Sequence, residues 1–437
     1  METQRKLKRL SIIFAILGYF LSPQNLLAER IYILYESYSE VSVCYTSAND
    51  FFYYIDVGGN GPSDIKVNAE GTLVYVTNYW GDTVSVIDTS TNSVINTIKV
   101  GSGPESIAIN NKESYLYVAN SGDGTISVIN TSTNAVTNTI AVGGSRPMII
   151  AIDPTGKHLY SINYKDNSVS VINTVNNTII AKVAVGKMPL GITVTHDGTK
   201  FYVSNSADDT ISVVDAATNM VISTIAVGAE PRSMAVNPTG KKLYVCNYWD
   251  HTVSVIDTAT NMVISNIEVS GGPISVRLNS EGTHLYVTNN IGGTISVILA
   301  STNEIVHDIW AGESPFAMAV GLNGPKSIVL GKVAVSVVGH EKLGVRNATV
   351  SLSTEYNSVT DSYGYFIIQN IRAGTYNLTI NDLDIIPISQ IITLSEGQIL
   401  DTDLPLMELS KGDVNEDKKV GLEDVIYILQ RLTGIRP

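Results

Sequence analysis

The sequence predicts an all-β protein whose main part is a seven-bladed β-propeller with four strands per blade. A unit of 42 or 43 residues recurs seven times between Arg30 and Gly321. Each unit carries a Tyr-Val-x-Asn strand and a Gly-x-x-Pro turn. A repeat of this length, built of short alternating strands, is typical of a propeller rather than a helical array. The turn prolines are Pro62, Pro104, Pro147, Pro189, Pro231, Pro273 and Pro315.

The tyrosine anchor has nearly the same period as the proline anchor. Tyr32 is an eroded copy, one residue out of step, and Ser270 stands where the turn glycine usually lies. The six regular copies are Tyr75, Tyr117, Tyr160, Tyr202, Tyr244 and Tyr286.

One unit shows why each blade has four strands. Its β-branched and aromatic runs are bounded by Gly, Asn and Asp, which favours strands joined by tight turns. Four strands per unit is the number in a propeller blade. The runs are residues 64–67, 73–77, 83–87 and 93–98.

The two ends of the repeat region predict how the ring closes. The N-terminal stretch supplies the second, third and fourth strands of a blade at residues 31–34, 41–44 and 52–57. The missing first strand is at residues 316–320. Pairing of one late strand with three early strands would remove the open sheet edge and fix both ends of the ring.

Residues 1–28 are typical of a secretory signal. Four basic residues precede an apolar stretch from Leu10 to Leu21, and Ala28 offers a small residue at the cut. An uncleaved membrane anchor is the alternative, but this stretch falls short of the ~20 residues that span a bilayer. The mature chain is therefore expected to be secreted to the cell surface, with no transmembrane span.

Charge and cysteine content narrow the function classes. The formal net charge is −13, and it becomes −16 once residues 1–28 are removed, so nucleic acid is not expected as a partner. Cys44 and Cys246 fall in the first and sixth blades, which are not neighbours in a ring of seven. We expect no disulfide between them, and stability must come from the buried strands.

The period ends after residue 321, and two smaller modules follow. Residues 322–330 are expected to form a linker, and residues 331–409 a small β-sandwich, because turn signals recur every 10 to 15 residues. The run Thr360-Asp361-Ser362-Tyr363-Gly364-Tyr365-Phe366, with Ala373-Gly374-Thr375-Tyr376, resembles the carboxypeptidase regulatory-like domain, which has a transthyretin-type fold. The resemblance implies a spacer or stability module.

Residues 410–437 contain an EF-hand-like loop followed by a helix. Oxygen ligands fall at loop positions 1, 3, 5 and 12, and a backbone carbonyl at position 7, which is the spacing that binds Ca²⁺. The alternative is a solvated acidic turn before a packed helix. The segment resembles one half of a dockerin, which implies a cohesin-like partner, but it has one loop instead of two and Lys418 where the family has Gly. The expected ligands are Asp413, Asn415, Asp417, Lys419 and Asp424.

The repeat itself resembles the YVTN β-propeller family, as in Val74-Tyr75-Val76-Thr77-Asn78. The resemblance implies a surface-layer or other cell-envelope protein that serves in structure, adhesion or partner binding, and the motif residues are structural. Some relatives resemble lactonases. Function on a propeller lies in its loops, because the strands are committed to packing.

The loops after the Tyr-x-x-Asn strands are expected on the same face as the Gly-x-x-Pro turns, around the channel mouth. Aromatic residues occupy alternate blades of this face, and two tryptophans stand beside carboxylates, a pairing suited to sugar rings. The alternative is that these aromatics cap blade edges or pack on each other. The expected ligand-binding residues are Tyr79, Trp80, Tyr164, Tyr248 and Trp249.

The sequence predicts a non-enzymatic envelope protein whose propeller binds a cell-surface protein or glycan. No nucleophile elbow, zinc motif or phosphate-cradling loop is present, and the histidines are scattered. The C-terminal modules would space the propeller and attach it in a calcium-dependent way. The alternative is a lactonase-like propeller hydrolase that gathers a metal at the channel mouth with its loop carboxylates.

Overall fold

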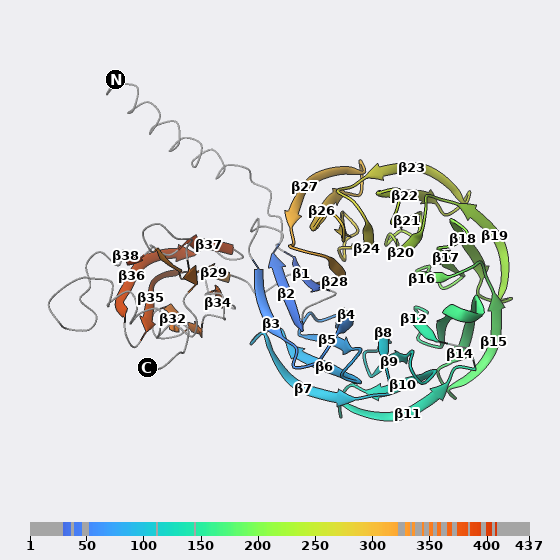
Figure 1. Cartoon of the computed structure of the whole chain (residues 1–437), viewed down its shortest axis with the longest axis horizontal. Coiled ribbons are helices and arrows are strands. Elements are labelled where there is room, and N and C mark those ends of the chain that lie inside the picture. Colours follow the sequence, from blue (N-terminus) through green and yellow to red (C-terminus); the bar gives the residue numbers. More distant parts are fainter. Residues whose placement is uncertain are drawn as a thin grey trace, which may run out of the picture.

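Seven four-stranded antiparallel sheets form a ring in the computed structural model of the chain (Figure 1). The structure describes residues 29–35, 39–45, 52–110, 112–143 and 146–321, together with separate strands between residues 328 and 408. The seven first strands of the blades contact one another in cyclic order around the ring axis. They are called the inner strands below. The prediction of a seven-bladed propeller with four strands per blade is confirmed.

The blades have nearly identical strand lengths, as the repeat predicts. Blades 2 to 4 contain β4 (Pro62–Val67), β5 (Leu73–Asn78), β6 (Thr83–Asp88), β7 (Ser93–Lys99), β8 (Pro104–Ile109), β9 (Tyr115–Asn120), β10 (Thr125–Asn130), β11 (Ala135–Ala141), β12 (Pro147–Ile152), β13 (His158–Asn163), the 3₁₀ turn η2 (Tyr164–Asp166), β14 (Ser168–Asn173) and β15 (Thr178–Ala184). Blades 5 to 7 contain β16 (Pro189–Val194), β17 (Lys200–Asn205), β18 (Thr210–Asp215), β19 (Met220–Ala226), β20 (Pro231–Val236), β21 (Lys242–Asn247), β22 (Thr252–Asp257), β23 (Met262–Glu268), β24 (Pro273–Leu278), β25 (His284–Asn289), β26 (Thr294–Leu299) and β27 (Glu304–Trp310).

Blade 1 closes the ring with strands from both ends of the repeat region. Its order is β28 (Pro315–Gly321), β1 (Arg30–Tyr35), β2 (Glu40–Tyr45) and β3 (Phe52–Asp56). In Figure 1 the blue strands β1 to β3 lie beside the brown strand β28. The register pairs Tyr32 with Ala319, and Tyr75 pairs in the same way with Lys66. Tyr32 is therefore in step with the other tyrosines in space, and the predicted closure is confirmed.

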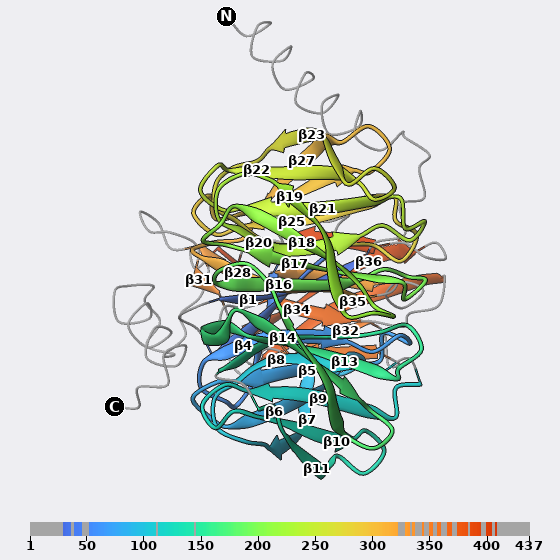
Figure 2. The same ribbon diagram turned by 90° about the vertical axis from the view of Figure 1, so that its right-hand side faces the viewer.

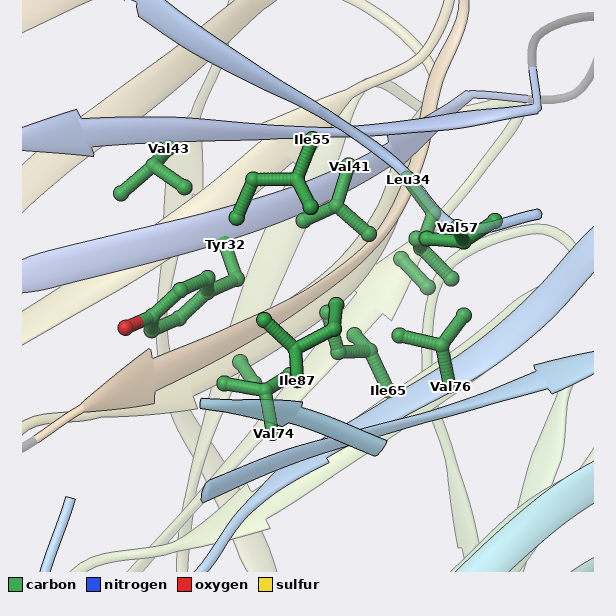
Figure 3. Packing of buried hydrophobic residues seen from close by; sticks show 12 residues of the cluster. Tyr32, Leu34, Val41, Val43, Ile55, Val57, Ile65, Val74, Val76 and Ile87 are labelled. Atoms are coloured by element: carbon green, nitrogen blue, oxygen red, sulfur yellow. The ribbon is translucent and has the colours of Figure 1, made fainter. Parts of the chain in front are cut away.

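The core lies between neighbouring blades. Figure 3 shows side chains of blade 1 packed against those of blade 2, among them Tyr32, Leu34, Ile65 and Val74. Each repeat tyrosine is almost fully buried in such a layer, which fits the prediction that this residue fills the core. Figure 2 shows the ring from the side, with the blade strands stacked across it.

The two sequence anchors touch each other. In blade 2 the Asn78 side chain donates from Nδ2 to Thr83 Oγ1 at 3.0 Å and to Ser85 Oγ at 2.9 Å. The same side chain lies against the turn, because a Cβ added to Gly59 would come within 2.2 Å of Asn78 Cγ. Glycine at this turn position therefore allows the asparagine to pack closely in blade 2. The equivalent asparagines are Asn120, Asn163, Asn205, Asn247 and Asn289.

Both cysteines are free and buried, as expected. Beyond the propeller, the described strands form three sheets, with the orders β34-β29-β37, β31-β30-β38 and β33-β32-β35-β36. Their bounds are β29 (Ile328–Lys332), β30 (Ala334–Ser336), β31 (Leu343–Gly344), β32 (Thr349–Leu352), β33 (Tyr356–Val359), β34 (Tyr365–Ile368), β35 (Gly374–Asp382), β36 (Ile385–Leu394), β37 (Ile399–Asp403) and β38 (Met407–Glu408). Residues 1–28, the predicted signal, lie outside the described residues. Among the residues that are described, no helix is long and apolar enough to cross a membrane.

Candidate functional site

Backbone hydrogen bonds place two sets of loops on one face of the ring. The loop between the second and third strand of a blade begins with an amide that donates to the Gly-x-x-Pro turn of the same blade. Tyr79 N donates to Gly61 O at 2.7 Å, and Tyr248 N donates to Glu230 O at 3.1 Å. The same bond recurs in blades 3, 4, 5 and 7. We call this side of the ring the turn face.

Loop carboxylates hold the turns of this face in place. Asp250 Oδ2 accepts from Ala229 N in its own blade at 2.8 Å. Asp82 Oδ1 instead accepts from Gly103 N of the following blade at 2.9 Å. Equivalent bonds are made by Asp123, Asp208 and Asp209. These carboxylates were expected to meet sugar hydroxyls or a metal, and the structure shows one oxygen of each bound to a turn amide.

The residues that cap the following blade adopt a left-handed backbone. Asp82 has φ 53° and His251 has φ 56°, a conformation that is uncommon outside glycine. His251 Nδ1 accepts from Gly272 N at 2.9 Å, so this ring carries its proton on Nε2. The blade-to-blade bonds offset the backbone strain and fix the loops that carry the aromatic residues.

Two Tyr-Trp pairs stand on the turn face, in blades 2 and 6. The rings of Tyr79 and Trp80 are 4.7 Å apart and meet edge to face, and Tyr248 and Trp249 do the same at 4.9 Å. Trp80 is 76% exposed and Trp249 is 58% exposed. Each tryptophan is thus held by its tyrosine while much of its surface remains in water, so neither serves chiefly to cap a blade edge.

Arginines that the sequence analysis did not single out complete the site. The Arg232 guanidinium lies 3.8 Å above the Tyr248 ring, and its Nε donates to Glu230 Oε1 at 2.9 Å. In blade 4, Arg146 lies 5.6 Å from the Tyr164 ring and pairs with Glu105 at 3.4 Å. These stacks are worth roughly 0.5–2 kcal/mol each. They bring aromatic, cationic and anionic groups together where the inner strands reach the turn face.

The tyrosine hydroxyls add hydrogen-bonding capacity. Tyr248 Oη donates to Asn290 Oδ1 of the next blade at 3.3 Å. Tyr248 therefore contacts Trp249, Arg232 and Asn290 at once. In blade 4 the equivalent residue is Tyr164, the first residue of η2. It has no aromatic neighbour in the described structure, so blade 4 presents a smaller aromatic surface than blades 2 and 6.

The histidines on the opposite face have a structural role. His158 Nδ1 lies 2.9 Å from Asp153 Oδ2, within the turn that joins β12 to β13. In the part of the chain that the structure describes, no group of three or more His, Cys, Asp or Glu side chains could hold a metal ion. The predicted calcium ligands at residues 413–424 lie outside the described residues.

Part of the chain matches one family model. Residues 88–188 and 184–266 match the model of the family described as lactonase, 7-bladed beta-propeller. These two matches lie within blades 2 to 6. In these residues the chain is similar to a lactonase propeller. No curated protein matches the chain significantly.

Solved structures share the ring architecture. A functionally unknown protein from Desulfotomaculum acetoxidans is 17% identical, with a TM-score of 0.60; the match covers 67% of this chain and 98% of that one. The hydrazine synthase of Kuenenia stuttgartiensis is also 17% identical, with a TM-score of 0.55, covering 70% of this chain and 95% of that one. At this identity the likeness shows the fold alone.

The family match corrects one prediction. The absence of familiar catalytic motifs led to the expectation of a protein without enzymatic activity. The lactonase match indicates that a hydrolase-type propeller fits these repeats, so that expectation is wrong as a firm statement. The physical reason is that a propeller gathers catalytic groups from loops of several blades, and such groups leave no contiguous motif.

Proposed function

We propose that the turn face binds a carbohydrate-like ligand, with the Tyr-Trp pairs of blades 2 and 6 as its platforms. The exposure of Trp80 and Trp249, each supported edge to face by a tyrosine, carries the proposal. Aromatic rings stack on the apolar faces of sugars, while polar groups beside them meet the hydroxyls. Arg232, Glu230 and Asn290 supply such polar groups next to Tyr248.

Rigidity of the platforms favours binding over chance exposure. Each loop is bonded to its own turn. The Asp250 carboxylate adds a second bond to its own turn, and the Asp82 carboxylate ties its loop to the turn of the next blade. A preorganised aromatic surface loses little conformational entropy when a ligand binds. We further propose, from the sequence, that the chain is secreted to the cell envelope and that residues 413–424 bind Ca²⁺ for attachment.

The first test is co-sedimentation of the chain lacking residues 1–28 with isolated cell envelopes, in calcium and in chelator. We expect Trp80→Ala and Trp249→Ala each to weaken binding about tenfold, because an aromatic stacking contact is worth on the order of 0.5–1.5 kcal/mol beyond the apolar area that it buries. Trp310→Ala is the control, because Trp310 is also exposed but belongs to an outer strand.

Binding that the two turn-face substitutions leave unchanged would contradict the glycan proposal. Binding lost only in chelator, and lost with Asp413→Ala or Asp424→Ala, would assign attachment to the C-terminal loop. The experiment therefore tests glycan binding by the turn face and calcium-dependent attachment by residues 413–424 independently.

A lactonase-type hydrolase is the second candidate, favoured by the family match over residues 88–266. Its groups would come from the same face, where Glu105 and Glu230 each pair with an arginine. The test is an assay of glucono-δ-lactone hydrolysis, in which the proton released by the acid product is measured. Turnover above the spontaneous rate that Glu105→Gln or Glu230→Gln reduces would support this candidate, and no turnover above background would count against it.

A further inference from the structure

The inner strands carry two basic residues at one level of the ring. The fifth residue of each inner strand pairs with the repeat tyrosine, so the seven residues at this position form one layer around the axis. Five of them are small and two are long cations. The layer consists of Lys66, Ala108, Ala151, Thr193, Ala235, Arg277 and Ala319.

The two cations lie within range of each other's charge. They belong to blades 2 and 7, and both inner strands contact β28 of blade 1, which lies between them. The residue of β28 in this layer is Ala319, which is too small to separate them. Burial lowers the pKa of Lys66; the charge of Asp64 acts against this and the charge of Arg277 adds to it. Each cation therefore feels the other's charge.

Among the residues that the structure describes, one carboxylate offsets these two charges. Asp64 lies 3.7 Å from Lys66 Nζ, but its oxygens also accept hydrogen bonds from Ile65 N, Ser106 Oγ and Ile107 N. Asp64 is thus committed to joining β4 to β8.

Arg277 has no carboxylate of its own. Its Nη1 donates to Ser233 Oγ at 3.1 Å and to the carbonyl of Val276 at 2.8 Å, and it forms no ion pair with any residue that the structure describes. In a chain of net charge −13, this layer carries an excess positive charge.

The layer remains open to solutes in part. The Lys66 side chain is 31% exposed although it belongs to an inner strand, and Arg277 is half-buried. Two cations that share one carboxylate leave one excess positive charge at a partly desolvated site, which destabilises the protein unless an anion joins them.

We propose that this layer binds an oxyanion, the carboxylate or phosphate group of a small solute, between Lys66 and Arg277. The planar guanidinium can donate two parallel hydrogen bonds to such a group, and the ammonium adds a compact charge. The site lies near the end of the inner strands away from the turn face, so it does not depend on the function proposed above.

The test is thermal unfolding of the full chain in sodium phosphate, in sodium malonate and in sodium chloride of equal ionic strength. An anion that binds only the folded state raises the melting temperature in proportion to its occupancy. We expect phosphate, malonate or both to raise it above the chloride value. Lys66→Gln and Arg277→Gln should each reduce this rise severalfold, and Lys187→Gln, which removes a 74% exposed lysine side chain, should not.

The melting temperature of each variant in sodium chloride shows whether the substitution itself disturbs folding. Lys66→Gln removes a charge that burial disfavours, so its melting temperature in chloride should equal or exceed that of the parent chain. A rise with malonate alone would identify a carboxylate ligand, and a rise with phosphate alone a phosphate ligand.

Calorimetric titration of the unaltered chain should give one site per chain for the effective anion. The proposal would be overturned if neither anion raised the melting temperature, or if both glutamine variants showed the same rise as the parent chain. A stoichiometry well above one site per chain would also overturn it.

Discussion

At the scale of single residues, the buried tyrosines show how repeat packing perturbs acid-base behaviour. Burial raises the pKa of Tyr160, Tyr202 and Tyr244 to about 12, because the phenolate would lose its hydration. The hydroxyls of Tyr202 and Tyr244 have no hydrogen-bond partner in the described structure. These residues therefore contribute to stability through the size of the ring, not through the hydroxyl.

This gives a prediction for alkaline pH. The folded state holds these phenolic protons more tightly than the unfolded state, so their contribution is complete below pH 10 and is lost as pH rises from 10 towards about 12. Each site should cost on the order of 2 kcal/mol across that window. Tyr202→Phe and Tyr244→Phe should reduce the fall in the free energy of unfolding above pH 10, and should change that free energy little at pH 7.

Denaturant unfolding between pH 7 and 12 measures the effect, with Tyr115→Phe, a 37% exposed tyrosine, as the matched control. The same loss of stability in the phenylalanine variants as in the parent chain would show that other groups cause it.

At the scale of elements, the closing strand matters most. All six residues of β1 are buried, and β1 joins β28 to β2. The residue before it also takes part, since Tyr286 Oη donates to Glu29 Oε2 at 2.7 Å. Arg30 adds a bond from Nη1 to Thr89 O of blade 2 at 2.8 Å. Residues 29–35 thus connect blades 7, 1 and 2.

A chain that begins at Ser39 should therefore be much less stable than one that begins at Glu29. It loses four fully buried apolar side chains, each worth roughly 1.5–3 kcal/mol, and exposes the edges of β28 and β2. Thermal unfolding and limited proteolysis of the two chains measure the difference. Equal melting temperatures would mean that the pairing of β1 with β28 does not hold the ring closed.

The repeat explains how much of the fold the sequence could predict. Blade number, strand order and the shared face of the loops follow from anchors that recur in nearly every unit. The stacking of Arg232 on Tyr248, and the proximity of Lys66 to Arg277, were not predicted, because these are single residues that depart from the repeat and meet only across blades. The capping role of Asp82 was missed because it depends on a left-handed φ, which the sequence pattern does not reveal.

At the scale of the whole molecule, the residues that hold the ring together are different from those that vary between blades. The packing of the tyrosines repeats in every blade and the asparagine hydrogen bonds repeat in blades 2 to 7, while aromatic and charged groups vary from blade to blade on the turn face and around the axis. The turn face presents Trp80 and Trp249 from blades on opposite sides of blades 7 and 1. A ligand that touched both would have to extend across the ring, which favours an extended glycan over a monosaccharide.

Fluorine NMR of the chain labelled with 5-fluorotryptophan tests the binding proposal most directly. The chain contains three tryptophans, so three resonances are expected, and single substitutions assign them. On addition of envelope polysaccharide, the resonances of Trp80 and Trp249 should shift or broaden while that of Trp310 stays in place. No change at any concentration, or a change confined to Trp310 in the outer strand of blade 7, would contradict ligand binding by the Tyr-Trp pairs.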